Sequence, residues 1–326
     1  MKLTRSPNRR QLLSGMTATV LTACATSEPT RGARTGGPAD SGSDGDTGAA
    51  WASDDTGLAV SMAGGVSVGV AHLSWAADGS EFEVRPAQHV VIGRDPGGAE
   101  RWRLEGLEPD GLNSPCKAEE HDGLIYVLLR GSHLIAVLDL DGFAVRTIGA
   151  EAVGGQDLHH PADFAFGPDD DLLYISDPPN HRVVVYALDG APVGELGLAD
   201  FDAPRHLNGP RGLAFDPDGR LHVVDRGDRC VQVFETDGAW VRSYSSPELV
   251  APDSIAIDAE GVVTVSDRHA AVLHLFDSDG QPIDRWIIEV DGWTAHPRQL
   301  TWTPQGDLYV HATNLHRDSA SGRRDP

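Results

Sequence analysis

The stretch LNGPRGLAFDPDGRLHVVDRGDRCVQVFETDGAWVRSYS, residues 207–245, decides the fold class. It contains four short apolar runs, at 213–215, 221–224, 230–234 and 240–244. An Asp-Pro-Asp-Gly turn, a polar loop and a Thr-Asp-Gly turn separate these runs. Alternating apolar residues between Asp-Gly turns predict antiparallel hairpins. A single four-stranded unit of this size cannot bury both faces of its sheet, so the unit needs neighbours.

Related units occur along the whole chain. Residues 158–197 and 249–287 repeat the same order of strands and turns, 114–149 and 69–104 follow it more loosely, and 296–314 holds two strands. The prolines that open the first strands are Pro115, Pro161, Pro210, Pro252 and Pro297, with separations of 46, 49, 42 and 45 residues. A period of about 40–50 residues with four strands per unit predicts a β-propeller.

Six such units predict an all-β fold, a six-bladed β-propeller of four-stranded antiparallel blades over residues 51–316. The sixth unit is short of strands, and an open ring would leave exposed sheet edges. We expect the apolar run at 58–62, ahead of the first unit, to add a strand to the last one. The alternative is a C-terminal blade that is incomplete.

The units resemble the NHL repeat. The shared pattern is a proline, a small or charged residue, an apolar strand, Asp-x-x-Gly, a strand ending in Asp, a polar loop, a strand and Asp-Gly. Residues 177–183 and 225–229 fit it best, and the resemblance is specific over 158–287 and weaker over 69–149. It implies a six-bladed propeller. It implies no particular reaction, because one fold hosts many functions.

The N-terminus has the pattern of an export signal. Basic residues precede a short apolar run at 11–23, which ends in Leu-Thr-Ala-Cys at 21–24. The run is too short to span a membrane as a helix, and it predicts a secretory signal peptide over 1–24. The pair Arg9-Arg10 resembles a twin-arginine export signal, and Leu-Thr-Ala-Cys resembles a lipoprotein box with Cys24 as the lipidated residue. A plain cleaved signal with an incidental cysteine is the alternative.

The remaining composition agrees with an exported, membrane-anchored domain. Residues 25–50 form a Gly-rich acidic segment that we interpret as a flexible tether, and we expect 317–326 to be a disordered tail. The chain has 49 acidic against 26 basic residues, a formal charge of -23. So acidic a chain argues against nucleic-acid binding, which needs a basic face. We expect a monomer, and no disulfide between Cys116 and Cys230, because their places in the repeat lie in distant blades.

One propeller face is the default site. The loops before each first strand and after each second strand lie on that face, around the mouth of the channel. It would carry Lys117, His159, His160, Asp163, Asp177, His181, Arg205, His206, Arg211, Asp225, Arg226, Asp253, Asp267, Arg268, His269, His296 and Arg298. Solvated loops are polar in any case. The candidate binding face we select is Lys117, Asp163, Arg211, Asp253 and Arg298, whose mixed charges suit a small anionic or zwitterionic ligand or a cell-envelope protein.

Histidines raise the question of a metal. His160, His206 and His296 come from three units, and three histidines on one face would make a water-accessible zinc site. Their positions relative to the opening prolines differ, however, so a shared site is not predicted. We therefore predict no metal or other cofactor, with Ca²⁺ or Zn²⁺ kept as an alternative.

The peptidyl-hydroxyglycine amidating lyase belongs to the same repeat class. The resemblance to it implies a catalytic zinc on histidines that directly follow the opening prolines. The corresponding residues here are Cys116, Ala162, Arg211, Asp253 and Arg298. None is a histidine, so this zinc site does not carry over.

Two functions follow as hypotheses. The preferred one is a lipid-anchored binding or scaffold module outside the cytoplasmic membrane. The alternative is a metal-dependent lyase or hydrolase related to the amidating lyase or to lactonase propellers. The alternative requires a bound metal and clustered carboxylates, and convergence of Asp163, Asp225 and His160 on an ion would support it. The sequence leaves open whether the chain is an enzyme.

Overall fold

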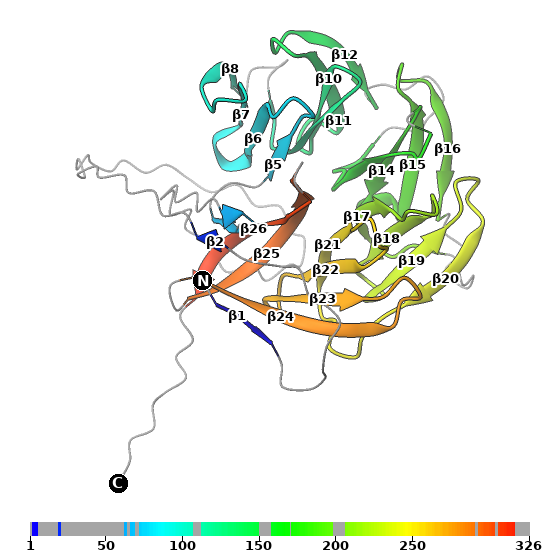
Figure 1. Cartoon of the computed structure of the whole chain (residues 1–326). Coiled ribbons are helices and arrows are strands. Elements are labelled where there is room, and N and C mark those ends of the chain that lie inside the picture. The colour runs from blue at the N-terminus through cyan, green and yellow to red at the C-terminus, as the bar shows by residue number, and fades with distance from the viewer. Residues whose placement is uncertain are drawn as a thin grey trace, which may run out of the picture.

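The computed structural model describes residues 2–5, 19–20, 62–63, 66–68, 72–106, 112–149, 158–169, 171–197, 206–290, 293–303 and 306–316. Four four-stranded antiparallel sheets, and the first four strands of an eight-stranded sheet, lie around a common axis as five propeller blades (Figure 1). The predicted fold class, an all-β propeller of four-stranded antiparallel blades, is confirmed.

Within each blade the strands pair in chain order, from the axis outward. Blade 1 contains β5 (His72–Trp75), β6 (Glu81–Arg85), β7 (Val90–Arg94) and β8 (Glu100–Glu105). Blade 2 contains β9 (Pro115–His121), β10 (Leu124–Leu129), β11 (Leu134–Asp139) and β12 (Ala144–Ile148). Blade 3 contains β13 (Phe164–Phe166), β14 (Leu172–Asp177), β15 (Arg182–Ala187) and β16 (Pro192–Leu196). Blade 4 contains β17 (Pro210–Phe215), β18 (Leu221–Asp225), β19 (Cys230–Phe234) and β20 (Trp240–Tyr244). Blade 5 contains β21 (Pro252–Ile257), β22 (Val263–Asp267), β23 (Val272–Phe276) and β24 (Pro282–Val290). Two short 3₁₀ turns, η1 (Pro86–Gln88) and η2 (Pro178–Asn180), follow β6 and β14.

A sixth unit closes the ring. It is the hairpin of β25 (Trp293–Trp302) and β26 (Leu308–His316), and β25 contacts β21 on one side and β5 on the other. The short strand β4 (Val66–Val68) runs parallel to β26. A strand from ahead of the first unit therefore joins the last unit, although it lies later than the predicted run at 58–62, of which 58–61 are outside the described residues.

Little of the N-terminal region is described. β1 (Lys2–Arg5) pairs with β24, and β2 (Thr19–Val20) pairs with β3 (Met62–Ala63). Cys24, the predicted tether and the predicted C-terminal tail lie outside the described residues. In the described part of the chain, no helix has the length and hydropathy needed to cross a membrane.

An aspartate side chain and a glycine backbone explain why the chain turns at each Asp-Gly sequence. In the turn between β11 and β12, Oδ1 of Asp139 accepts hydrogen bonds from the backbone N–H groups of Asp141 (3.0 Å) and Phe143 (2.8 Å). Gly142 follows with a φ of 84°, which glycine adopts without strain. Asp95 and Asp277 make the same contact in the corresponding turns of blades 1 and 5, and Asp216 and Asp258 make it in the turn between the first two strands of blades 4 and 5. The aspartate and the glycine together fix where each hairpin reverses.

The core lies between the blades. Tyr126 and Ile135 of blade 2 pack against Phe164 and Tyr186 of blade 3, and all four are almost fully buried. Similar hydrophobic clusters join each of the other successive pairs from blade 1 to the sixth unit. Each blade therefore buries its faces only against its neighbours, which explains why one unit alone does not make a domain.

Polar contacts also connect neighbouring first strands near the axis. Ser74 Oγ of blade 1 donates to the carbonyl of Ala118 in blade 2 (2.6 Å). Between blades 4 and 5 the backbones approach so closely that a Cβ on Gly212 would lie 2.7 Å from the Cα of Ser254. Ser254 Oγ in turn accepts from the N–H of Leu300 in the sixth unit (3.3 Å).

Two buried histidines lie where the ring closes. The Nε2 atom of His311 accepts from the N–H of Leu73 (3.3 Å), and Nδ1 of His72 accepts from the N–H of Ala118 (3.3 Å). Thr301 Oγ1 lies 3.3 Å from Nε2 of both rings. Burial lowers the pKa of His311 to about 3, and burial together with the nearby His311 and Lys117 lowers the pKa of His72 well below its usual range. Both rings are thus neutral in the folded protein at neutral pH.

Acid is expected to destabilise this closure. Below pH 6.5 the two histidines bind protons when the chain unfolds but stay neutral in the folded state. Their contribution to the free energy of unfolding is therefore complete above pH 6.5 and is lost progressively as the pH drops. Each histidine contributes about 1.4 kcal/mol per pH unit in that window. In urea titrations between pH 7 and 5, His311→Asn should flatten the pH dependence by about one proton. His269→Ala, an exposed control, should leave the slope unchanged; an equal slope in wild type and His311→Asn would contradict the prediction.

Candidate functional site

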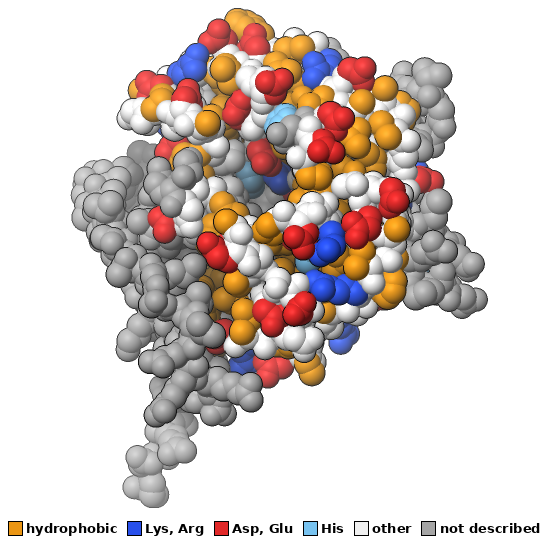
Figure 2. Space-filling model, turned by 45° about the vertical axis from the view of Figure 1, so that its right-hand side comes forward, with side chains coloured by type: hydrophobic (Ala, Val, Ile, Leu, Met, Phe, Trp, Pro, Cys, Tyr) orange, Lys and Arg blue, Asp and Glu red, His pale blue; other side chains and the backbone are white. Residues whose placement is uncertain are grey.

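A cavity of ≈ 580 Å³ lies where the inner ends of the blades meet. Figure 2 shows one face of the molecule hollowed near its centre, with basic, acidic and histidine side chains around the hollow. The cavity is lined by Pro86, Ser114, Cys116, Arg130, Ala162, Asp163, Arg211, Arg226, Asp253, Ser254, Arg268, Arg298 and Gln299. Its size falls within the range of small-molecule sites.

Two repeated positions of the propeller supply most of this lining. One is the residue directly after the proline that opens each first strand, which gives Cys116, Ala162, Arg211, Asp253 and Arg298. The other is the residue directly after each second strand, which gives Pro86, Arg130, Arg226 and Arg268. Because both positions lie at the channel end of the two innermost strands, different blades present them to the same space.

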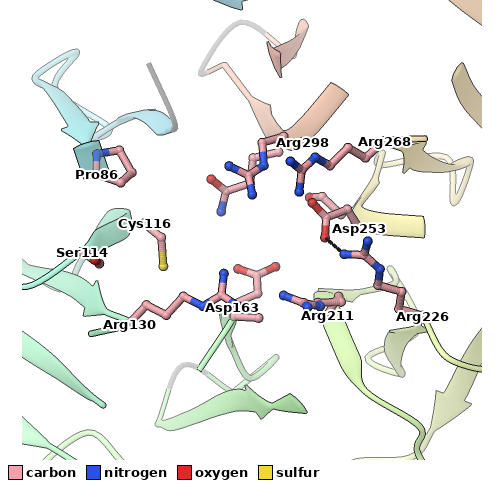
Figure 3. A pocket seen from close by; sticks show the side chains of 13 residues that line it. Pro86, Ser114, Cys116, Arg130, Asp163, Arg211, Arg226, Asp253, Arg268 and Arg298 are labelled. Atoms are coloured by element: carbon pink, nitrogen blue, oxygen red, sulfur yellow. Dashed lines mark hydrogen bonds and ion pairs between the residues drawn. The ribbon is translucent and has the colours of Figure 1, made fainter. Parts of the chain in front are cut away.

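Arginine dominates the cavity. Five guanidinium groups, from Arg130, Arg211, Arg226, Arg268 and Arg298, extend toward a common space, as Figure 3 shows. The only acidic residues in the lining are two aspartates, which leaves a formal excess of three positive charges. Arg226 Nη1 lies 3.4 Å from Asp253 Oδ1. Among the described residues the other four arginines have no carboxylate within 4.0 Å. The electrostatics of the cavity therefore favour an anion.

Arg211 is the least satisfied of these side chains. Its Nε is buried and has no hydrogen-bond partner among the described residues. Burial lowers the pKa of Arg211 to about 10, with Asp253 opposing the shift and Arg130 among the nearby cations that add to it. Burial and the nearby Arg298 also lower the pKa of Arg268. A buried donor without a partner is costly, so an acceptor from a ligand would stabilise this arrangement.

Asp163 lines the cavity but holds the blades together. Its Oδ1 accepts from Nζ of Lys117 in blade 2 (3.0 Å), and its Oδ2 accepts from the N–H of Leu213 in blade 4 (3.0 Å). Its own blade contributes the N–H of Phe164 (2.8 Å). One buried carboxylate thus joins three blades, and both of its oxygens are occupied by protein donors.

Lys117, which the sequence places on the candidate binding face, is not in the cavity lining. Its ammonium group donates to Asp163 and to the carbonyl of Phe164 (2.6 Å), lies 3.2 Å from Glu119, and lies over the Phe164 ring. Burial alone would lower the pKa of Lys117, but Asp163 and Glu119 outweigh it and raise the pKa. The structure thus makes Lys117 a link between blades 2 and 3.

Removal of Asp163 should destabilise the propeller strongly. Asp163→Ala removes the buried carboxylate partner of the Lys117 ammonium group and leaves the backbone N–H of Leu213 without its acceptor, which is expected to lower the free energy of unfolding by about 3–5 kcal/mol. The double variant Lys117→Met, Asp163→Leu should recover much of that loss, because it removes the buried positive charge as well. Asp141→Ala, whose carboxylate pairs with Arg101 on the surface, should change stability by less than about 0.5 kcal/mol. Chemical denaturation measures all three, and equal losses in the single and double variants would rule out the explanation.

Removal of Arg211 should instead increase the stability of the ligand-free protein. Arg211→Met deletes a poorly satisfied buried cation that lies among other cations, so the ligand-free protein should gain about 1 kcal/mol, or roughly 2–4 °C in Tm. Arg101→Met, on the surface, serves as the control. Calorimetry in a buffer without multivalent anions tests this; a clear decrease in Tm for Arg211→Met would show that the guanidinium is satisfied in the free protein.

The structure separates the three histidines that were weighed as metal ligands. His206 Nε2 lies 3.1 Å from Asp228 Oδ2, and Nδ1 of His296 lies 2.8 Å from the carbonyl oxygen of Arg268. His160 lies elsewhere, beside other histidines. These three side chains do not form a common site, as their unequal positions in the repeat predict.

The set that would support the enzyme hypothesis does not converge either. Asp225 is fully buried and accepts from the N–H of Asn208 and from Nε2 of Gln232, while burial raises its pKa. Asp163 is committed to its neighbouring blades, and His160 belongs to a separate cluster. Among the described residues these three side chains are not grouped as possible ligands of one ion, which counts against this version of the enzyme hypothesis.

The cavity itself does not suit a cation. The oxygens of Asp163 already accept hydrogen bonds, Asp253 faces Arg226, and five guanidinium groups surround them. Cys116 is not a ready ligand or nucleophile, because burial raises the pKa of its thiol to about 12. Cys116 and Cys230 are both free thiols.

A group of histidines lies instead where blades 2 and 3 meet. His133, His159 and His160 have potential ligand nitrogens that all lie within 4.8 Å of one another. In the described part of the chain this is the one group of three or more such side chains able to hold a metal. His133 was not among the candidates from the sequence, because nothing in the linear order links it to blade 3.

Arg130, Arg226 and Arg268 are cavity residues outside the five candidates selected from the sequence. Arg226 and Arg268 were placed on the correct face, and Arg130 was missed. The sequence contains the information needed to find these three arginines, because each of them directly follows a second strand. Of the five candidates, Asp163, Arg211, Asp253 and Arg298 do line one cavity.

Comparisons with known proteins agree with the fold. A family model described as SMP-30/gluconolactonase/LRE-like region matches residues 149–251, which span blades 3 and 4. A streptogramin B lyase structure shares 15% identity over 74% of this chain and 76% of its own, with a TM-score of 0.59. A catalytically inactive virginiamycin B lyase from Staphylococcus aureus, solved with quinupristin, shares 18% identity over 71% of this chain and 73% of its own (TM-score 0.57). A gluconolactonase from Xanthomonas campestris shares 22% identity over 74% of this chain and 82% of its own (TM-score 0.58).

The fold and these matches define the chain as a β-propeller. Its residues 149–251, in blades 3 and 4, are similar to the SMP-30/gluconolactonase/LRE-like region. The solved structures, at these identities, are similar in fold alone. The resemblance to NHL repeats remains a prediction.

Proposed function

We propose that the chain is a binding propeller whose central cavity captures a small ligand with two or more carboxylate or phosphate groups. The observation that carries this proposal is the set of five arginines around one cavity, with an excess of three positive charges. Guanidinium groups bind carboxylates and phosphates through paired hydrogen bonds. A ligand with two or three negative charges would match the excess.

The shape and the unsatisfied donor of the cavity support the same ligand class. A volume of ≈ 580 Å³ suits a small molecule rather than a protein segment. The buried Nε of Arg211 needs an acceptor, and the described protein provides none. The arginines come from blades 2, 4 and 5 and the sixth unit, so a ligand with several anionic groups can contact several blades at once.

The proposed setting follows from the N-terminus. Export through the signal at 1–24 and lipidation at Cys24 would hold the propeller at the membrane, with the tether at 25–50 between anchor and domain. A monomeric, NHL-type receptor for a soluble anion outside the cytoplasmic membrane is the arrangement we propose. A cell-envelope protein as the partner remains the prediction from the sequence alone.

Multivalent anions should stabilise the protein, and neutral sugars should not. Citrate, inorganic phosphate and glucose 6-phosphate are suitable probes, with glucose as the neutral match. At 100 times Kd a ligand adds about 2.7 kcal/mol of stability. Arg211→Gln or Arg298→Gln should weaken binding by roughly 10- to 100-fold, and Arg211→Glu with Arg298→Glu should abolish it. Titration calorimetry and thermal unfolding measure both effects.

Controls separate cavity binding from general charge effects. Arg101→Gln removes a surface arginine that pairs with Asp141 and should leave binding unchanged. Added NaCl should weaken binding only moderately, because buried charges are screened less than exposed ones. If the anions stabilise the wild type and the double variant Arg211→Glu, Arg298→Glu equally, the site assignment is wrong.

A second candidate function is hydrolysis of a lactone, which the family match over residues 149–251 favours. Hydrolysis adds water to the ring ester and produces a hydroxy acid, whose new carboxylate the arginines could bind. Asp253 would be the acid–base group, because the oxygens of Asp163 are occupied. Release of acid from a sugar lactone, followed with a pH indicator, tests this. Turnover that Asp253→Asn abolishes would establish that the protein is an enzyme. If the lactone stays intact, the binding function is the one supported.

A further inference from the structure

Three imidazoles meet where blades 2 and 3 join. His133 lies in the turn after β10, and His159 and His160 lie in the segment that leads to β13. Their ring centroids are 4.3 Å apart for His133 and His160, 4.8 Å for His159 and His160, and 5.0 Å for His133 and His159. His159 and His160 are exposed and His133 is half-buried, so the cluster is open to solvent.

The cluster is assembled by the backbone of both loops. The N–H of His159 donates to Oδ1 of the fully buried Asp177 (3.1 Å), which fixes the incoming segment against blade 3. His133 and His160 both have a left-handed backbone, with φ of 60° and 49°. Among the described residues no hydrogen bond engages a ring nitrogen of the three histidines. Their donor atoms are thus available and face one another.

This arrangement is not a general consequence of the repeat. The equivalent turn in blade 1 holds His89, which has a similar φ of 54°. There the ring is used structurally, since Nδ1 of His89 accepts from the N–H of Ser114 (3.0 Å). The difference between the two junctions is the His159-His160 pair, which adds two more imidazoles to the one that the turn provides.

We propose that His133, His159 and His160 form a binding site for a divalent transition-metal ion, of which Zn²⁺ is the best match. Three imidazoles around a zinc ion at 2.0–2.1 Å leave a fourth position for water or a ligand. Nitrogen ligands in such a site are about 3.3 Å apart, so the present spacing, within 4.8 Å, closes through small rotations of exposed side chains. Imidazole selects Zn²⁺, Ni²⁺, Co²⁺ or Cu²⁺ over Mg²⁺ and Ca²⁺.

The three histidines lie close in sequence to two residues of the cavity lining. Arg130 precedes His133 by three residues, and Ala162 follows His160 by two, and both line the cavity. The donors are nevertheless separate from the cavity lining, so the metal site stands whether or not the cavity binds anions. An ion here would also connect blades 2 and 3, and its binding would stabilise the folded protein.

The test is Zn²⁺ binding to the untagged full-length chain by competition with a chromophoric chelator, with Co²⁺ absorption as a second readout. One equivalent should bind, and Co²⁺ should give visible bands typical of nitrogen ligation in a four- or five-coordinate site. His133→Asn, His159→Ala and His160→Asn should each weaken binding by roughly 10- to 100-fold. Asparagine is chosen at 133 and 160 because it tolerates the left-handed backbone.

His269→Ala, which removes an exposed histidine of blade 5, is the matched control and should bind as wild type does. Thermal unfolding of every variant without metal verifies folding, and Zn²⁺ should raise Tm in wild type and His269→Ala only. Loss of binding confined to the three cluster variants supports the site. Absence of stoichiometric binding in wild type, or binding that His133→Asn and His160→Asn do not affect, would overturn it.

Discussion

The inner edge of each first strand is the constraint on which this propeller depends. A first strand pairs with its own blade on one side and faces the axis on the other, where no further strand can pair. Its polar groups must still find partners. Side chains of the preceding blade supply them, as when Lys117 donates to the carbonyl of Phe164 and Asp163 accepts from the N–H of Leu213. These two charged residues therefore connect blades 2, 3 and 4, and residues beside them face the cavity.

Most of the fold could be predicted from the sequence because its information is local. The opening prolines, the Asp-Gly turns and the alternating apolar residues each act within one blade, and they recur at a regular period. Ring closure is different, since it joins segments more than 200 residues apart. The apolar run at 58–62 and the strand Val66–Val68 are similar in composition, so hydrophobicity alone could not decide which of them joins the last unit.

The site could be predicted where the repeat determines the direction in which a side chain points. Equivalent positions in different blades point to one axis, which is why Arg211, Asp253 and Arg298 were found. What the sequence could not show is which charged residues satisfy each other. Lys117 and Asp163 resemble ligand contacts until their contact across the blade boundary is seen. His133 was missed for the same reason, because its neighbours belong to the next blade.

The charge of the chain would make the proposed anion site selective. The formal charge of the protein is -23, whereas the cavity has an excess of three positive charges. An anion approaching from solution is repelled by the surface as a whole and attracted only over short distances near the arginines. A weakly charged anion gains little from such a site, while one with several acidic groups can satisfy guanidinium groups from several blades. Since Arg211 is poorly satisfied in the ligand-free protein, part of the free energy of the proposed anion binding would come from relief of repulsion already present in the folded protein.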